Sequence, residues 1–457
     1  MQESKLITGN ITKSLLLFAL PMIAGNLLQQ CYNIADTIIV SRFLGADALA
    51  AVGSAYTLMT FLTSIILGLC MGSGASFSIS FGQKDYDRMK ISIFQSFVFI
   101  AIVTILLNVA VFLGIDGIIW FLRVPASVQG LMKDYLLVIF AGITGTFFYN
   151  YFASLLRSVG NSKAPLFLLA LSSVLNIVLD LFFVLRLDWG VKGAAFATIL
   201  SQYVSGIGLA AYTRFRMPEL MPHRRHAKWS SSIFHEITSF SFLTCMQQSV
   251  MNFGILMVQG LVNSFGPVIM AAFAAAVKID SFAYMPVQDF GNAFSTFIAQ
   301  NYGAKKEDRI RRGIKISFCM SFLFCLLVSF LVCFFAEPLM QIFVSSRETE
   351  IIAAGVHYLH IEGAFYFGIG LLFLLYGLYR AIARPGMSVV LTVISLGTRV
   401  VLAYLLSAVP LLNVTGIWMS VPIGWALADI TGILYYLHLS GSKPKIQVHF
   451  SLHKKSR

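Results

Sequence analysis

The chain has 457 residues, of which 58% are hydrophobic and only 12% are charged, and its mean hydropathy is +0.80. Soluble domains carry about 25% charged residues, so these values exclude an ordinary soluble protein and indicate that lipid surrounds most of the chain. The formal net charge of +13 is compatible with a nucleic-acid-binding protein, but the positions of the basic residues give it another explanation.

Twelve apolar runs are long enough to cross the bilayer, which takes roughly 20 residues of helix for about 30 Å of hydrocarbon. Backbone polar groups in lipid must be satisfied within the segment, so each run is predicted to be an α-helix. The predicted fold class is therefore an all-α polytopic membrane protein with twelve transmembrane helices. The runs lie near 14–40, 49–81, 91–118, 131–156, 164–185, 191–213, 237–263, 268–300, 314–336, 351–379, 386–408 and 415–439.

The basic residues are distributed unequally between the two sets of alternate loops. The N-terminus, the tail and one set of loops hold about 25 Lys and Arg, whereas the opposite loops hold about 6. Positive charge concentrates on the cytoplasmic side, so both termini are predicted to be cytoplasmic. We expect these side chains to contact anionic lipid head groups, and we expect no nucleic-acid partner.

Three sequence features recur at an offset of 221–223 residues, each at the same point in the helix order. An even number of helices separates the copies, so the halves should share one orientation and be related by a pseudo-twofold axis along the membrane normal, with the transport pathway between them. The paired features begin at Gly82 and Gly303, Arg157 and Arg380, and Val191 and Val414. The predicted organisation is an N-terminal segment 1–13, an N-lobe 14–213, a cytoplasmic linker 214–236, a C-lobe 237–439 and a basic tail 440–457.

Carboxylates inside the bilayer cost about 2.5–3.5 kcal/mol on insertion scales, so they mark candidate functional sites. Asp36 lies in the first predicted helix and Asp180 in the fifth, where Asn176 is one turn earlier on the same face. With the Thr198 hydroxyl of the sixth helix, these oxygens predict a site for H⁺ or Na⁺. The alternative is hydrogen bonding between helices, which has most weight for Asn176 and Thr198. The corresponding positions of the second half, found with the repeat offset, lack this polar set. They are Met257, Arg399, Ala403 and Val421.

The second half contains its own ionisable residues. Asp280 and Glu362 are candidates for a substrate site or a second proton site, and Arg399 is expected to pair with a nearby carboxylate. Lys278 and Asp280 are expected near the outer end of their helix, where water would solvate them. Pro21 precedes Asp36 in the first helix, so a bend there is a candidate hinge that couples to protonation, with a static kink as the alternative.

Several motifs of enzymes and pumps are missing from the sequence. There is no GxxxxGK[ST] loop, no HExxH and no GxSxG. His357 and His360 have a metal-like spacing but lack further ligands. We therefore expect no enzyme activity, no cofactor and no metal beyond a coupling Na⁺, and we expect an ion gradient to supply the energy.

Five motifs together are specific for one family of transporters: Asn33-Ile-Ala-Asp36-Thr after Pro21, the segment 45–53, Arg157-Ser-Val-Gly-Asn-Ser-Lys, Asn176-x-x-x-Asp180 and the segment 298–305. By these motifs the chain resembles the bacterial branch of the multidrug and toxic compound extrusion (MATE) family over its whole length. The resemblance implies two six-helix lobes around a central cavity, and antiport of amphipathic, often cationic, organic compounds against H⁺ or Na⁺ by alternating access. The alternatives are a flippase for a lipid-linked oligosaccharide, which needs a more basic cavity, and an intramembrane enzyme or receptor.

The family resemblance also assigns residues. Its first-lobe cation site matches Asp36, Asn176, Asp180 and Thr198. Some members carry an acidic residue in the seventh helix, where this chain has Gln247 and Gln248, and this departure argues against a second-lobe Na⁺ site of that kind. Gln247 stays with Asp280, Glu362 and Arg399 as a possible substrate or second-lobe site. We expect a monomer integral to the bacterial inner membrane.

Overall fold

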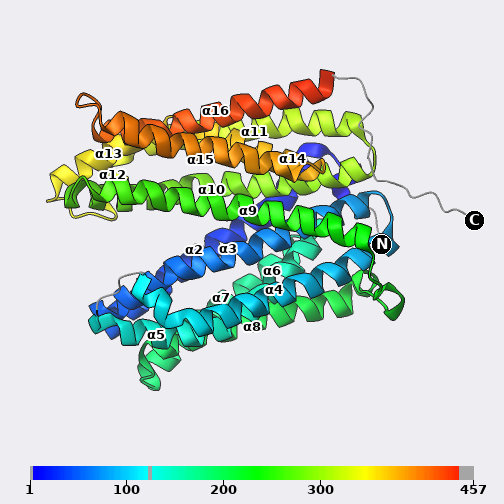
Figure 1. Ribbon diagram of the computed structural model, residues 1–457, viewed down its shortest axis with the longest axis horizontal. Coiled ribbons are helices and arrows are strands. Elements are labelled where there is room, and N and C mark those ends of the chain that lie inside the picture. Colours follow the sequence, from blue (N-terminus) through cyan, green and yellow to red (C-terminus); the bar gives the residue numbers. More distant parts are fainter. Residues whose placement is uncertain (1–3, 122–125, 442–457) are drawn as a thin grey trace, which may run out of the picture.

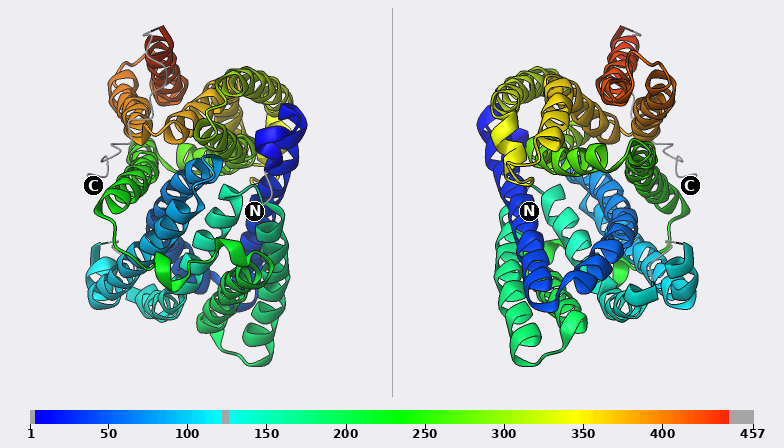
Figure 2. Two further views of the ribbon diagram at one scale, coloured as in Figure 1. Left: turned by 90° about the vertical axis from the view of Figure 1, so that its right-hand side faces the viewer. Right: turned by 90° about the vertical axis from the view of Figure 1, so that its left-hand side faces the viewer.

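The computed structural model describes residues 4–121 and 126–441, and within them the chain forms helices and turns and no strand (Figure 1). Two bundles lie side by side, one built from the first half of the chain and one from the second half (Figure 2). Both ends of the described chain lie at the same end of the molecule, here called the terminal end. The predicted tail 440–457 falls almost wholly outside the described residues, as do the first three residues.

The first bundle, the N-lobe, follows a short helix α1 (Lys5–Thr8). Two of its helices, α5 and α6, form one span that is bent by 44°, and a π-helical segment η1 (Phe182–Arg186) extends α7. The lobe contains α2 (Ile11–Leu44), α3 (Ala46–Gly82), α4 (Tyr86–Phe121), α5 (Ala126–Ala141), α6 (Ile143–Ser158), α7 (Lys163–Leu181) and α8 (Gly190–Arg216).

The second bundle, the C-lobe, has the same plan. Its α13 and α14 form a span bent by 51°, and the short α12 precedes them. The lobe contains α9 (Ser231–Asn263), α10 (Pro267–Gly303), α11 (Glu307–Phe334), α12 (Ala336–Gln341), α13 (Thr349–Gly363), α14 (Tyr366–Ala381), α15 (Pro385–Ser407) and α16 (Val414–Gly441).

The prediction of twelve membrane helices is confirmed. Among the described residues, nine helices are long and apolar enough to span a membrane, and the two bent pairs raise the number to 11. The twelfth span is α9, which has 33 residues and packs against α3 and α15, but polar side chains such as Gln247 and Gln248 lower its hydropathy.

Helix breaks do not coincide with the prolines. Pro21, Pro286 and Pro422 each lie inside a helix that continues through them. The N-lobe span bends instead at Gly142, where a Cβ would come within 2.6 Å of the Ile199 side chain on α8. A glycine is required there because the neighbouring helix approaches so closely.

The turns repeat between the lobes as closely as the helices do. Among the described residues, five turn positions of the N-lobe have positive φ, and all but Asp188 recur in the C-lobe at the offset of 221–223 residues seen in the sequence. Left-handed backbone is uncommon outside glycine, so this agreement supports a duplicated backbone plan. The pairs are Gly45 and Gly266, Lys84 and Lys305, Gly160 and Ala383, and Gly190 and Asn413.

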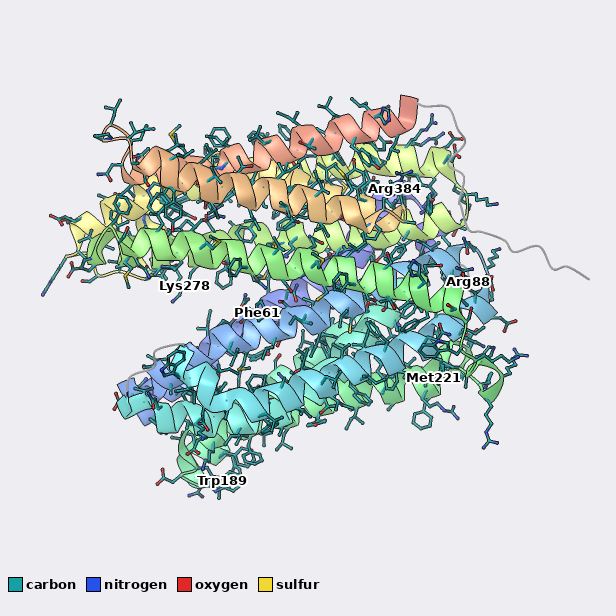
Figure 3. All side chains as sticks on the ribbon, in the orientation of Figure 1. Phe61, Arg88, Trp189, Met221, Lys278 and Arg384 are labelled. Atoms are coloured by element: carbon teal, nitrogen blue, oxygen red, sulfur yellow. The ribbon has the colours of Figure 1, made fainter. Side chains whose placement is uncertain are left out.

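The lobes touch at the terminal end and separate at the other. The helices α3 and α10 cross so closely that a Cβ on Gly82 would lie within 3.0 Å of the Gln300 carbonyl oxygen, and the equivalent Gly303 would meet Ile79 in the same way. By contrast, a Cβ added to Gly53, near the far end of α3, would meet no atom within 4 Å. The ribbons diverge toward that end (Figure 1), and the labelled Phe61 and Lys278 lie on opposite lobes (Figure 3).

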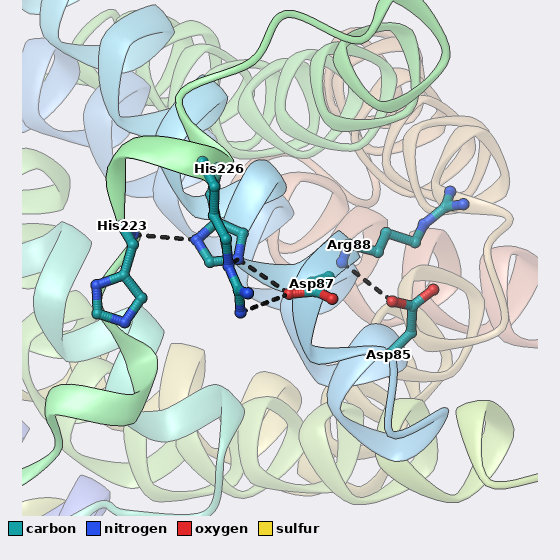
Figure 4. A network of polar contacts seen from close by, with 6 residues as sticks. Asp85, Asp87, Arg88, His223 and His226 are labelled. Atoms are coloured by element: carbon teal, nitrogen blue, oxygen red, sulfur yellow. Dashed lines mark hydrogen bonds and ion pairs between the residues drawn. The ribbon is translucent and has the colours of Figure 1, made fainter.

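The linker between the lobes is held on the N-lobe. It spans residues 217–230, shorter than the predicted 214–236 because α8 and α9 extend into it. Buried His226 places Nε2 2.9 Å from Oδ1 of Asp87 at the start of α4, and Arg225 Nη2 is 3.5 Å from the same oxygen (Figure 4). Arg88 also forms an ion pair with Glu236 of α9, which ties the first helix of the C-lobe to α4.

Candidate functional site

The four residues of the predicted first-lobe site come together from three helices. Asp36 lies on α2, Asn176 and Asp180 on α7, and Thr198 on α8. Asn176 Nδ2 is 3.4 Å from Thr198 Oγ1, and the carboxyl groups of Asp36 and Asp180 are close enough to interact directly. Buried Tyr135 of α5 is near enough to both carboxyl groups to interact with them electrostatically. Sequence reasoning missed it, since a tyrosine in an apolar run is usually packing.

The oxygens of this site lack partners. Asp180 is 0% exposed and Asn176 is 1% exposed. Among the described residues, Asp36 Oδ1, Asn176 Oδ1 and both oxygens of Asp180 are buried and accept no hydrogen bond. Buried polar atoms are normally paired, and two adjacent buried carboxylates repel each other. A proton or a Na⁺ ion would satisfy these atoms, so the residues present fit either cation.

The backbone beside Asp180 is unusual. This residue lies at the end of α7, and the π-helical segment η1 begins two residues later. Such segments occur often at functional sites, because the inserted residue changes the direction of neighbouring side chains. Asn176 and Asp180 therefore share one face of α7, as their i, i+4 spacing predicted, and the helix changes type just after them.

A second polar cluster lies inside the C-lobe. Asp280 of α10 accepts a hydrogen bond of 2.6 Å from the Tyr358 hydroxyl, and Tyr366 donates to its other oxygen. Tyr358 also contacts Glu362 one turn later on α13. The expectation that Asp280 is solvated near a helix end was wrong, because it is 2% exposed and α13 and α14 cover it. Lys278, two residues earlier on another face, is exposed.

Arg399 of α15 completes this cluster. Its Nη2 lies 3.9 Å from Oε1 of Glu362, so the expected pairing with a carboxylate is confirmed. The tyrosine donors were missed by the sequence reasoning. The spacing of Tyr358 and Glu362, four residues apart on one helix face, was the signal that could have identified them.

Gln247 lies outside these contacts and lines a cavity between the lobes instead. The cavity is small and partly open, and it is bounded by α3 of the N-lobe and α9, α10 and α14 of the C-lobe. The predicted second-lobe set is therefore divided, with three members in the acidic cluster and Gln247 at the cavity. The lining residues are Met71, Gln247, Gln248, Gln288, Asn292, Phe373, Tyr376 and Arg380.

One hydrogen bond links the first helix directly to the other lobe. Asn26 Nδ2 donates to Oδ1 of Asp289 on α10 at 2.6 Å, while Oδ2 of Asp289 is buried without a partner in the described residues. Arg157 of α6 lies near enough to act on Asp289 electrostatically. Asn26 is five residues after Pro21 in α2, so the candidate hinge adjoins this contact between the lobes.

Comparison with known proteins is consistent with this geometry. The MatE family model matches residues 21–182 and 241–405, one segment in each lobe. The probable multidrug resistance protein YpnP of Bacillus subtilis is 30% identical over 435 residues, covering 94% of this chain and 95% of that protein. An FAD transporter of Shewanella oneidensis is 23% identical over 445 residues, covering 94% and 95%.

Solved structures share the fold. An outward-facing multidrug resistance MATE family transporter of the MOP superfamily superposes with a TM-score of 0.91 at 23% identity, covering 97% of this chain and 100% of that one. The family match extends over well more than half of the sequence and includes α2 and α7 with their paired carboxyl groups. The chain belongs to the MatE family of membrane transporters.

Proposed function

We propose that this transporter exports amphipathic organic compounds in exchange for H⁺ or Na⁺ by alternating access. The observation that carries the proposal is the set of buried, unpaired oxygens at Asp36, Asn176 and Asp180, in a lobe that also bounds the cavity between the lobes. The exporter resides in a bacterial plasma membrane as a monomer, with the terminal end in the cytoplasm.

The cation acts through α2. A proton or Na⁺ shared by Asp36 and Asp180 joins α2 to α7, and α2 carries Asn26, which bonds to the C-lobe through Asp289. Cation occupancy therefore biases the contact between the lobes, with Pro21 as the place where α2 bends. By thermodynamic linkage, cation and substrate then weaken each other's binding by the same factor.

The gradient supplies sufficient energy for export. Moving one charge across 100 mV is worth about 2.3 kcal/mol, and one pH unit adds about 1.4 kcal/mol per proton. A hundredfold substrate gradient requires about 2.8 kcal/mol. One cation per cycle therefore supports a gradient of about this size.

The C-lobe cluster gives a second place for a proton or for a cationic group of the substrate. Asp280 and Glu362 carry two carboxyl groups against the single guanidinium of Arg399. Since Glu362 pairs with Arg399, this arginine is not available as the basic surface that a lipid-linked oligosaccharide flippase needs. Loss of a cell-envelope polymer on gene deletion, without drug sensitivity, would favour the flippase.

Dye efflux from proteoliposomes tests the proposal. Ethidium efflux should follow an imposed pH gradient or an imposed Na⁺ gradient, each applied alone, and Asp36→Asn should abolish this coupling. A matched control is Asp116→Asn, since Asp116 is an exposed aspartate paired with Lys133 at 2.5 Å. Full-rate, gradient-driven efflux by correctly inserted Asp36→Asn protein would refute the mechanism.

A further inference from the structure

The cavity between the lobes contains a charged group that the transport cycle above does not use. Arg380, in the last turn of α14, is 5% exposed and lines the cavity. Around it are the side-chain amides of Gln247, Gln248, Gln288 and Asn292. The described lining includes no carboxylate, so a cationic ligand meets no opposite charge there.

Arg380 itself is paired only with neutral groups. Its Nε donates to Ser295 Oγ at 3.3 Å and its Nη2 donates to Asn292 Oδ1 at 2.9 Å. Among the described residues no carboxylate forms an ion pair with it, and Nη1 has no acceptor. A buried charge without a counter-charge costs several kcal/mol. Arg399, the other intramembrane arginine of the C-lobe, differs because Glu362 accompanies it.

We propose that this cavity is a binding subsite for an oxyanion, a carboxylate or phosphate group carried by the transported amphiphile. Guanidinium groups form short charge-assisted hydrogen bonds with such groups, often through two nitrogens. The amide nitrogens of Gln247 and Gln288 can donate to the remaining oxygens, and Phe373 and Tyr376 provide apolar surface beside them. This inference rests on the proposed transport function and adds amphiphiles that carry a carboxylate or phosphate group to its substrates.

The arrangement divides two tasks between separate places. The carboxyl groups of Asp36 and Asp180 bind the coupling cation in the N-lobe, while Arg380 binds an oxyanion of the transported compound at the contact between the lobes. Because the cavity is bounded by α3 as well as by C-lobe helices, a group bound there touches both lobes. Separation of the lobes at α3 therefore removes part of the subsite.

The proposal can be tested with two dyes that share one ring system and differ in whether they carry a free carboxyl group. Rhodamine 110 has a free carboxyl group, and rhodamine 123 is its methyl ester. Binding to purified protein, by fluorescence anisotropy, and efflux from proteoliposomes should both be measured. Arg380→Gln should weaken rhodamine 110 binding by about tenfold or more, the loss of about 1.4 kcal/mol, and leave rhodamine 123 within about twofold. Arg380→Lys should be intermediate, since it retains the charge without the planar fork.

The matched control is Arg384→Gln, four residues later. Arg384 donates to the Tyr435 hydroxyl at 2.7 Å and does not line the cavity, so this change should leave both dyes unaffected. If Arg380→Gln does not yield folded protein, Gln288→Met keeps the side-chain size and removes an amide donor, and it should weaken rhodamine 110 several-fold more than rhodamine 123.

Equal loss of both dyes in folded Arg380→Gln protein, or no dependence on the carboxyl group in the wild type, would overturn the inference. If added phosphatidylglycerol competes for binding in a way that requires Arg380, while dye binding does not depend on Arg380, the subsite belongs to lipid. That result would also overturn the inference. The binding measurement, made without a gradient, separates failure of the proposed subsite from failure of the proposed transport function. Carboxylate-dependent binding without gradient-driven efflux would support the subsite and reject the antiporter.

Discussion

The crossing of α3 and α10 allows a quantitative test of alternating access. Gly82→Ala and Gly303→Ala each place a methyl group within 3.0 Å of a helical backbone carbonyl of the other lobe, at Gln300 and Ile79. Ordinary contacts with a Cβ begin at 3.4 Å, so the helices must move apart. A side chain could rotate away from the methyl group, but a hydrogen-bonded backbone cannot.

The size of the effect follows from the overpacking alone. Overpacking of this kind costs about 1–3 kcal/mol, whereas the helix propensity that alanine gains over glycine is the same in both states and cancels. The cost falls only on the state in which the lobes touch at the terminal end. It therefore shifts the conformational equilibrium away from that state by about 5–150-fold. Because both glycines lie at one crossing, the double variant should show less than the sum of the two shifts.

Spin labels on exposed Lys163 of α7 and Asp308 of α11 report the separation of the lobes at the terminal end by electron–electron distance measurements. Each alanine variant should populate a longer distance than the wild type. Gly53→Ala, in the same α3 helix but with nothing within 4 Å of the added carbon, should leave the distribution unchanged and slightly raise thermal stability. An unchanged distribution in both crossing variants would refute the reasoning.

Three further changes test individual contacts. Asn26→Leu removes the hydrogen bond to Asp289 and should lower the free energy of unfolding by about 1–3 kcal/mol in a thermal melt; a neutral result would mean that the contact does not hold the lobes. Arg309→Met removes the guanidinium that donates to the carbonyls of the α1 segment at 2.6–3.2 Å, and amide exchange in that segment should accelerate; unchanged protection would contradict the assignment. Glu236→Gln weakens the pair with partly exposed Arg88 and should cost about 0–1 kcal/mol, less at high salt; a salt-independent loss would point to packing.

Much of the fold was predictable from the sequence, because lipid imposes simple rules. Apolar length identified the helices, and the offset between Gly82 and Gly303 identified the duplication, which the positive-φ turns then repeat. The bends within the two broken spans were not predictable from proline. The N-lobe span bends at Gly142, where Ile199 of α8 approaches closely, and this is a tertiary contact with no local signal.

The candidate sites were predictable to different degrees. Asp36 and Asp180 were identified because an intramembrane carboxylate is costly, and the structure brings them together. The cost of an intramembrane carboxylate also identified Asp280. The sequence, however, predicted that water surrounds it, and only the fold shows that α13 covers it. Arg380 was visible in the sequence as a repeat partner of Arg157, but its lack of a counter-charge depends on which side chains α9 and α10 place beside it.

The central claim is that cation occupancy of the Asp36–Asp180 pair controls substrate affinity. Ethidium affinity of the purified protein, measured across a range of pH and of Na⁺ concentration, tests it most directly. In the wild type, affinity should fall by about tenfold or more as one of these cations loads, within the range of typical coupling free energies. Asp36→Asn/Asp180→Asn protein should bind ethidium with an affinity that neither pH nor Na⁺ changes. The same cation dependence in the variant as in the wild type would contradict the account.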